Sequence, residues 1–162
     1  MERLIPTLTP LYNAGFGVIG QANFTSRVSG ANQNNFNSST GVATDRAGNL
    51  YVADYVNSRV MMFQPPFSNG MNAAVVIGQA NFTSNGAATT QNGLVNPYGV
   101  ATDSAGNLYV ADYGNSRVLI FQPPFSNDMN AGDIYQSGYV SIVYPNNRKN
   151  IFYIPNAGIA KI

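Results

Sequence analysis

The 162-residue sequence contains no cysteine and no histidine, and it is poor in charge. Without cysteine the chain forms no disulfide and performs no thiol chemistry. Cysteine usage therefore does not indicate its redox compartment. Without histidine it lacks the commonest catalytic acid–base side chain and metal ligand. Charged residues make up 9% of the chain and the net charge is +1, which gives no electrostatic basis for binding nucleic acid or an anionic membrane.

Long hydrophobic runs are also absent. The longest, Ala73 to Ile77, is far too short to span a bilayer, so we expect no membrane insertion. The opening residues, MERLIPTLTPLYNAG, lack the basic-then-apolar pattern of a signal peptide. Low charge with abundant Asn, Ser and Thr resembles extracellular repeat proteins, so we favour the cell surface or the outside of the cell, although the compartment stays unknown.

The sequence contains an internal repeat. Residues Val18 to Ala73 align without a gap onto Val76 to Ala131, a shift of 58 residues, with 39 identities in 56 positions. The longest shared stretch begins with GVATD at Gly41 and Gly99 and continues through LYVAD to QPPFSN. Self-similarity at a fixed period indicates one supersecondary unit used repeatedly, each unit burying its apolar face on the next.

Each copy is interpreted as short strands. In the second copy, strands are expected at Gly99 to Asp103, Leu108 to Asp112 and Arg117 to Gln122, separated by Gly, Asn, Asp and Ser. Pro123-Pro124 cannot donate to a ladder and should end the third strand. The first copy offers Ala73 to Gly78 as a fourth strand. Four antiparallel strands per repeat, without helical periodicity, predict an all-β fold of β-propeller-type blades.

A degenerate third copy is expected near the end of the chain. With a shift of 43, the segment from Val143 to Ile162 overlays the segment from Val100, although a divergent tail is the alternative. We therefore predict a single repeat domain over 1–162, with repeat cores at 41–78, 99–137 and 139–162. Long Asn- and Thr-rich inserts occupy 21–40 and 79–98.

The string PYGVATDSAGNLYVADYGNSRVLIF strongly resembles the NHL repeat, and its matches are Gly41 to Val60 and Gly99 to Val118. The resemblance implies a β-propeller, most often of six blades. Two blades and a partial third cannot close such a ring. Blades that do not form a closed ring leave an apolar sheet face and sheet edges exposed to water. We expect either a fragment of a longer protein whose further blades cover that face, which we favour, or copies that assemble to close a ring. The isolated chain should then self-associate or aggregate.

Two pairs of opposite charges recur five residues apart, Asp54 with Arg59 and Asp112 with Arg117. We interpret them as structural ion pairs that brace a turn; the alternative is that the arginines anchor an anionic ligand. Asp45 and Asp103 precede Gly-Asn turns and offer too few oxygens for calcium, so we expect each to cap its own turn. No metal and no cofactor are expected.

A ligand should bind where the inserts emerge beside the loops between the second and third strands, because loops on a rigid scaffold commonly carry binding. Neutral amides and aromatic faces suit a protein or a glycan. The candidate binding residues are Tyr55, Asn57, Tyr113, Asn115, Asn23 and Asn81. The rival interpretation is that the inserts pack on the neighbouring blade as filler, with Phe24 and Phe82 as anchors.

The expected function is therefore a non-catalytic binding or scaffold module. One alternative is part of a lactonase-like or lyase-like propeller enzyme whose catalytic residues lie in absent blades, and another is a purely structural surface repeat. The lyases bind zinc through histidine, which is absent, and the hydrolases need clustered carboxylates, of which only seven exist in the chain. RNA-binding members of the family use a basic face with aromatics, whereas the arginines here are scattered.

Overall fold

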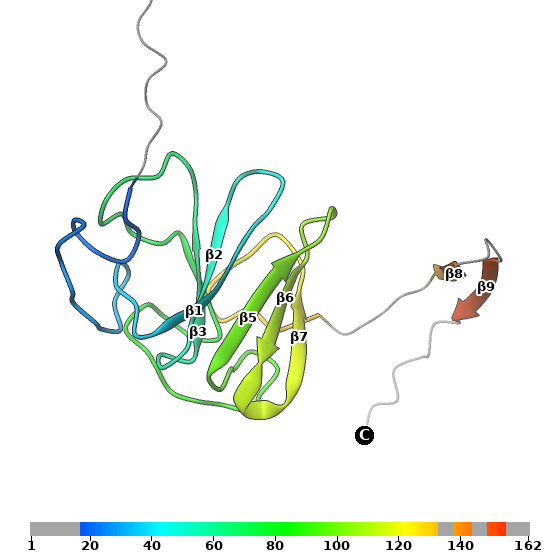
Figure 1. Ribbon diagram of the computed structural model, residues 1–162. Coiled ribbons are helices and arrows are strands. Elements are labelled where there is room, and N and C mark those ends of the chain that lie inside the picture. The colour runs from blue at the N-terminus through cyan, green and yellow to red at the C-terminus, as the bar shows by residue number, and fades with distance from the viewer. Residues whose placement is uncertain (1–16, 133–137, 144–148, 155–162) are drawn as a thin grey trace, which may run out of the picture. The chain divides into compact units, whose positions relative to one another are not determined.

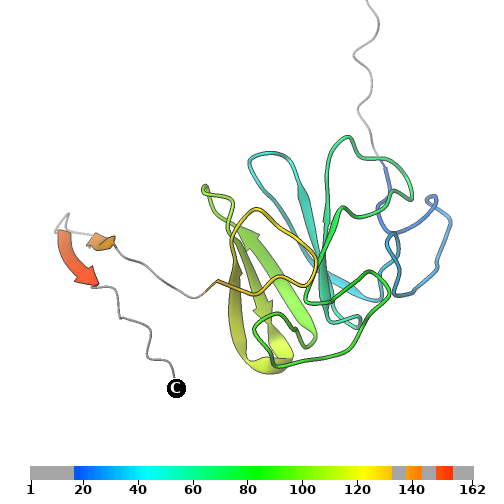
Figure 2. The same ribbon diagram turned by 180° about the vertical axis from the view of Figure 1, so that it is seen from behind.

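Each full copy of the repeat folds into its own antiparallel sheet. The computed structural model describes residues 17–132, 138–143 and 149–154. The first sheet has the order β1 (Ser39–Thr44), β2 (Leu50–Asp54), β3 (Arg59–Phe63) and β4 (Val75–Ile77). The second has the order β5 (Pro97–Thr102), β6 (Leu108–Asp112) and β7 (Arg117–Phe121), with a short 3₁₀ helix η1 (Tyr113–Asn115) before β7. Figure 1 shows both sheets, and Figure 2 shows them from behind.

The predicted blade of four strands is confirmed for the first copy. In the second copy the position of the fourth strand, 58 residues after β4, lies outside the described residues. The strand limits differ slightly from the expected ones, since β5 begins at Pro97 and β7 ends at Phe121. No helix in the described part of the chain is long and apolar enough to cross a membrane.

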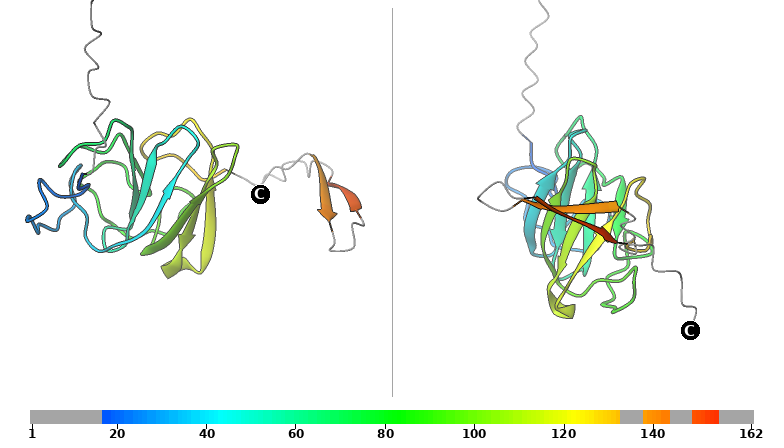
Figure 3. Two further views of the ribbon diagram at one scale, coloured as in Figure 1. Left: turned by 45° about the horizontal axis from the view of Figure 1, so that its top comes forward. Right: turned by 90° about the vertical axis from the view of Figure 1, so that its right-hand side faces the viewer.

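The two sheets meet through their first strands, β1 and β5, which lie side by side (Figure 3, left). A Cβ atom on Gly41 would lie 2.8 Å from the carbonyl oxygen of Tyr98, so the close approach of the two backbones requires glycine. The hydroxyl of Thr102 donates to the carbonyl of Thr44 at 2.7 Å. These contacts fix the second blade against the first at their inner strands.

Side chains pack against both faces of the first sheet, although Val42 in β1 stays exposed. On one face Val52, Met61 and Phe63 pack with Phe36 and other residues of the preceding insert; we call this the N-terminal core cluster. On the other face, Tyr51, Val60 and Met62 pack against the second sheet in what we call the interblade core, whose buried members also include Leu94, Leu108, Val110 and Phe121. Because strand side chains alternate between faces, a sheet buried on both sides shows the nearly continuous burial seen in β2 and β3.

The inserts are held down by Phe36 and Leu94, which occupy equivalent positions in the two copies. The rival interpretation makes Phe24 an anchor, which is wrong, because its side chain is 71% exposed. Phe82 is half-buried against the N-terminal core cluster. Phe36 and Leu94 align at the shift of 58, but so do Phe24 and Phe82, so this alignment alone does not identify the anchors.

Two further strands, β8 (Gly138–Val143) and β9 (Lys149–Ile154), pair as an antiparallel hairpin. They belong to a separate unit, residues 132–162, while the residues up to Ala131 form the other. A hairpin is what the first two strands of a blade require, but the rest of the expected third copy lies outside the described residues. The third blade and the single domain over 1–162 therefore stay predictions.

Candidate functional site

Three tyrosines form a row across the two blades at the end where β2 and β6 finish. Tyr55 directly follows β2, Tyr113 directly follows β6, and Tyr98 lies at the start of β5 between them. The ring centroids of Tyr55 and Tyr98 are 6.4 Å apart, and those of Tyr98 and Tyr113 are 6.0 Å apart. Tyr98 and Tyr113 are 58% and 65% exposed. We call these residues the tyrosine row.

The loop below each outer tyrosine is fixed by a buried aspartate. Oδ2 of Asp54 accepts hydrogen bonds from Nε of Arg59 at 2.7 Å and from the side-chain amide of Asn57 at 2.8 Å. Its other oxygen accepts from the backbone N–H of Asn37, near the end of the first insert, at 2.7 Å. The carboxylate thus joins the loop, the third strand and the insert.

The second blade repeats this arrangement. Oδ2 of Asp112 accepts from Nε of Arg117 and from the side-chain amide of Asn115, both at 2.8 Å. Its other oxygen accepts from the backbone N–H of Val95 at 2.7 Å. Each expected Asp–Arg pair is therefore brought together at the foot of a loop that carries a tyrosine.

The arginines also hold the inserts in place. Nη2 of Arg59 donates to the carbonyls of Asn32 and Asn35, both at 2.9 Å. Nη2 of Arg117 donates to the carbonyls of Thr90 and Gly93, at 2.7 and 3.0 Å. Because the guanidinium donors are directed at the chain's own carbonyls, the geometry offers no open fork for an anionic ligand.

Asn57 and Asn115 do not occupy the position expected of ligand-binding residues. Asn57 is buried, and its two amide N–H groups are used by Asp54 and by the carbonyl of Gly30. Asn115 is half-buried and makes the equivalent bonds to Asp112 and to the carbonyl of Ala88. Both amides hold the loop, and their binding role stays a prediction.

Asn23 and Asn81 lie near the starts of the inserts and are exposed. The side-chain oxygen of Asn23 accepts from the backbone N–H groups of Thr25 and Ser26, and that of Asn81 from those of Thr83 and Ser84. Each therefore caps its own turn, and neither joins the ring contacts of the tyrosine row.

The opposite end of each blade contains the Asp-x-x-Gly-Asn turns. Asp45 accepts from the backbone N–H groups of Ala47 and Asn49, both at 2.9 Å, so the predicted turn cap is confirmed. Burial raises the pKa of Asp45, but hydrogen bonds from Asn49 and Tyr51 outweigh it and leave the pKa below its ordinary value. Burial, together with the bond to Asp45, raises the pKa of the Tyr51 hydroxyl. The hydrogen bond from the side chain of Asn107 likewise lowers the pKa of Asp103.

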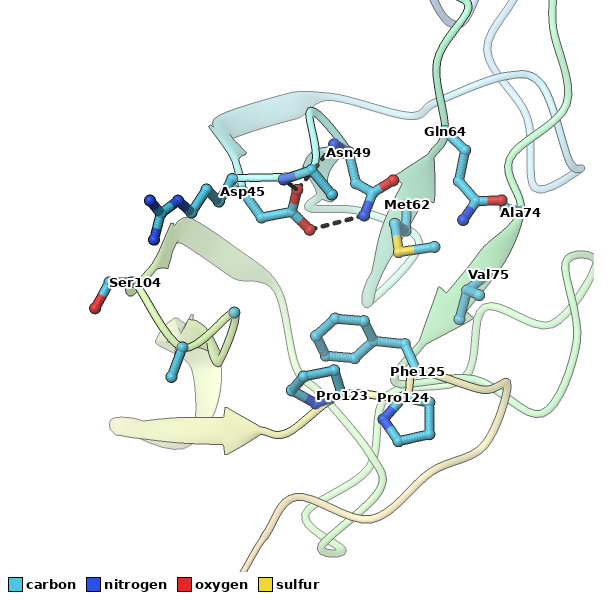
Figure 4. A pocket seen from close by; sticks show the side chains of 14 residues that line it. Asp45, Asn49, Met62, Gln64, Ala74, Val75, Ser104, Pro123, Pro124 and Phe125 are labelled. Carbon is cyan, nitrogen blue, oxygen red and sulfur yellow. Dashed lines mark hydrogen bonds between the residues drawn. The ribbon is translucent and has the colours of Figure 1, made fainter.

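A cleft of about 530 Å³ opens between these turns and the proline loop of the second blade (Figure 4). The ring of Phe125 lies near its centre, between Met62 and Pro123. The carboxylate of Asp45 lies at its rim and is already occupied by four hydrogen bonds from within its own turn and strand. The cleft thus has an apolar floor and no free carboxylate from Asp45.

The described residues contain no set of three or more acidic, cysteine or histidine side chains that could hold a metal ion. The carboxylates of this part of the chain accept hydrogen bonds from the protein itself: Asp45, Asp54, Asp103, Asp112 and Asp128. A general base or metal ligand needs a lone pair directed at a substrate or ion, whereas Asp54 and Asp112 are buried and Asp45 and Asp103 bond their own turns.

The two sheets, with their inner strands adjacent and their loops gathered at two ends, are β-propeller-type blades. The family model of the NHL repeat matches residues 94–121, which run from the anchor of the second insert to the end of β7. The chain therefore contains an NHL repeat, and the resemblance drawn from its sequence is confirmed. Comparison with curated proteins gives no match.

Proposed function

We propose that the two blades form a non-catalytic binding and scaffold module whose contact surface is the tyrosine row. The observation that carries this proposal is the exposure of Tyr98, at the start of β5, and of Tyr113, whose loop is held from below by Asp112 and Arg117. Tyrosine provides a large contact area at a small cost in conformational entropy, and it is enriched among residues that dominate binding energy. A rigid support lowers the entropy that is lost when a partner docks.

The chemistry of the surface favours a neutral partner. The charged side chains below the row, Asp54 with Arg59 and Asp112 with Arg117, neutralise each other. The row itself offers aromatic faces and phenolic hydroxyls, which suit a peptide backbone or the ring of a sugar. The partner class is therefore a protein segment or a glycan, and an experiment that offers both classes separates them.

The absence of histidine and the hydrogen bonds that occupy Asp45 and Asp54 support a role without catalysis. An enzyme of lactonase-like or lyase-like type, completed by residues of further blades, is the competing function. Elemental analysis of the purified protein for calcium and zinc, together with lactonase and lyase assays, would reveal that alternative.

The binding role is tested by screening the full chain against glycan and peptide arrays. A double variant, Tyr98→Ala with Tyr113→Ala, should lose the ligands that the natural chain captures. Phe24→Ala is the matched control, because Phe24 is also an exposed aromatic side chain but lies outside the row. Capture of the same ligands by the double variant, or an array without binders together with hydrolase or lyase turnover, would contradict the proposal.

A further inference from the structure

The second sheet carries an apolar face whose counterpart on the first sheet is buried. Tyr51 pairs with Met62 and Ala53 with Val60, so these four side chains share one face, and the second blade covers it. The same register in the second sheet pairs Tyr109 with Ile120 and Ala111 with Val118. We call these last four residues the outer face. Val60 is fully buried, whereas Val118, its counterpart, is 61% exposed.

On the opposite side of the first sheet, part of the surface is exposed where the equivalent part of the second sheet is buried. Val100 of β5 packs into the interblade core, whereas its counterpart Val42 of β1 is 68% exposed. Phe125 of the second blade meets the ring of Tyr51 edge-on at 5.6 Å, and Phe67, its counterpart in the first blade, is half-buried. We call the surface formed by the exposed Val42 and by Phe67, which packs at the edge of the N-terminal core cluster, the front face.

The two arginines also differ in burial between the first and the second blade. The side chain of Arg59 is fully buried, and one of its nitrogens donates to the carbonyl of Phe82 in the insert of the following repeat. The side chain of Arg117 is 30% exposed, and its donors reach carbonyls of its own insert. The neighbour that completes the burial of Arg59 thus belongs to the following repeat.

We propose that the outer face of one copy of this chain docks on the front face of a second copy, in the relation that already places the first blade against the second. The occupant is a second copy for the following reason. Within the chain, the equivalent face of the first sheet is covered by the second blade, and the two blades have nearly the same sequence. Val118 should then pack beside Val42 of the next copy, and Tyr109 should meet Phe67 as Tyr51 meets Phe125. The hydroxyl of Thr44 should donate to the carbonyl of Thr102 in the neighbour.

Such a contact joins two different surfaces, so it is heterologous and propagates from copy to copy until a ring closes. It buries apolar side chains that are otherwise in contact with water, which is the driving force for association. It does not depend on the binding role, because neither the outer face nor the front face includes a residue of the tyrosine row.

The test is light scattering on the purified full chain with three single variants. Val42→Asp removes the front face, Val118→Asp removes the outer face, and Val28→Asp is a matched control on an exposed valine of the first insert. All three valines are exposed, so each substitution leaves the chain's own core intact. The natural chain and Val28→Asp should have a mass above the 17.3 kDa of one chain.

Val42→Asp and Val118→Asp should each be monomeric when alone. Mixed in equal amounts, they should form a dimer and nothing larger, because the first variant keeps an intact outer face and the second an intact front face. A monodisperse monomer of the natural chain would overturn the proposal. It would mean that another segment of the same chain covers the outer face. Dimers of Val42→Asp alone would also overturn it, since they would join two outer faces.

Discussion

Nε of Arg59 lies 2.7 Å from Oδ2 of Asp54, and both side chains are fully removed from solvent. The pair does more than neutralise two buried charges, because the same aspartate also accepts from the first insert and the same arginine donates to it. A buried charge that loses its partner is costly, since it keeps neither its hydration nor its ion pair. The pair is therefore a structural brace for the loop that carries Tyr55.

Replacement of Arg59 by alanine should lower the free energy of unfolding by about 3–5 kcal/mol, because Asp54 would be left buried and unpaired. Arg117→Ala should cost less, about 1–3 kcal/mol, because Arg117 is partly exposed. Denaturant titrations give both values, with Arg46→Ala as an exposed control. Ligand binding by folded Arg117→Ala should survive but weaken, because the loop of Tyr113 loses one brace and keeps the bond from Val95 to Asp112. Unchanged stability with abolished binding would instead make Arg117 a ligand-binding residue.

Acid should destabilise the blades through the turn aspartates. Asp45 and Asp103 have pKa values below their ordinary value of 3.8, so the folded state favours their ionised form. The stability they contribute is present above the ordinary pKa and is lost as the pH falls through the folded pKa, because the unfolded chain takes up protons first. Asp45→Asn should therefore flatten the decline in stability between about pH 5 and about pH 2.

The measurement is chemical denaturation across that pH range, with Asp128→Asn as a control that leaves both turns intact. If the stability of the Asp45→Asn variant declines as steeply as that of the natural chain, the carboxylate of this turn contributes nothing to acid sensitivity.

The insert anchors should be sensitive to small changes in volume. Leu94→Ala removes a fully buried side chain and should cost about 2–5 kcal/mol. Gly78→Ala should also destabilise, since Gly78 has a φ of +90° and a Cβ there would lie 2.5 Å from Leu94. Gly86→Ala is the matched control, because nothing lies within 4 Å of its Cβ position, and its effect should stay within about 0.5 kcal/mol. Equal effects at Gly78 and Gly86 would contradict this packing.

The sequence predicts the blades well because their signals are local. LYVAD in both copies forms the second strand of its sheet, and Asp45 caps the turn that its spacing indicates. The loop-holding bonds of Asn57 and Asn115 could not be predicted, because each amide bonds a carbonyl 27 residues away, a contact that no local pattern reveals.

The sequence does not indicate Tyr98, for a different reason. The first copy has Thr40 at the equivalent position, so comparison of the two copies directs attention away from it. Its place between Tyr55 and Tyr113 depends on how β5 lies beside the first sheet, which is a tertiary relationship. The alternation of buried and exposed residues in β6 and β7 likewise depends on which blade faces are covered.

The tyrosine row is tested most directly by measuring the affinity of an array-selected ligand for the natural chain and for Tyr98→Ala, with Phe24→Ala as control. Loss of the central ring should weaken binding at least tenfold, which corresponds to about 1.4 kcal/mol, while the melting temperature stays close to that of the natural chain. Tyr98→Phe should lose less, because it keeps the aromatic face. Phe24→Ala should bind as the natural chain does. An affinity that is unchanged in Tyr98→Ala, or lowered equally in Phe24→Ala, would contradict the assignment of the tyrosine row as the contact surface.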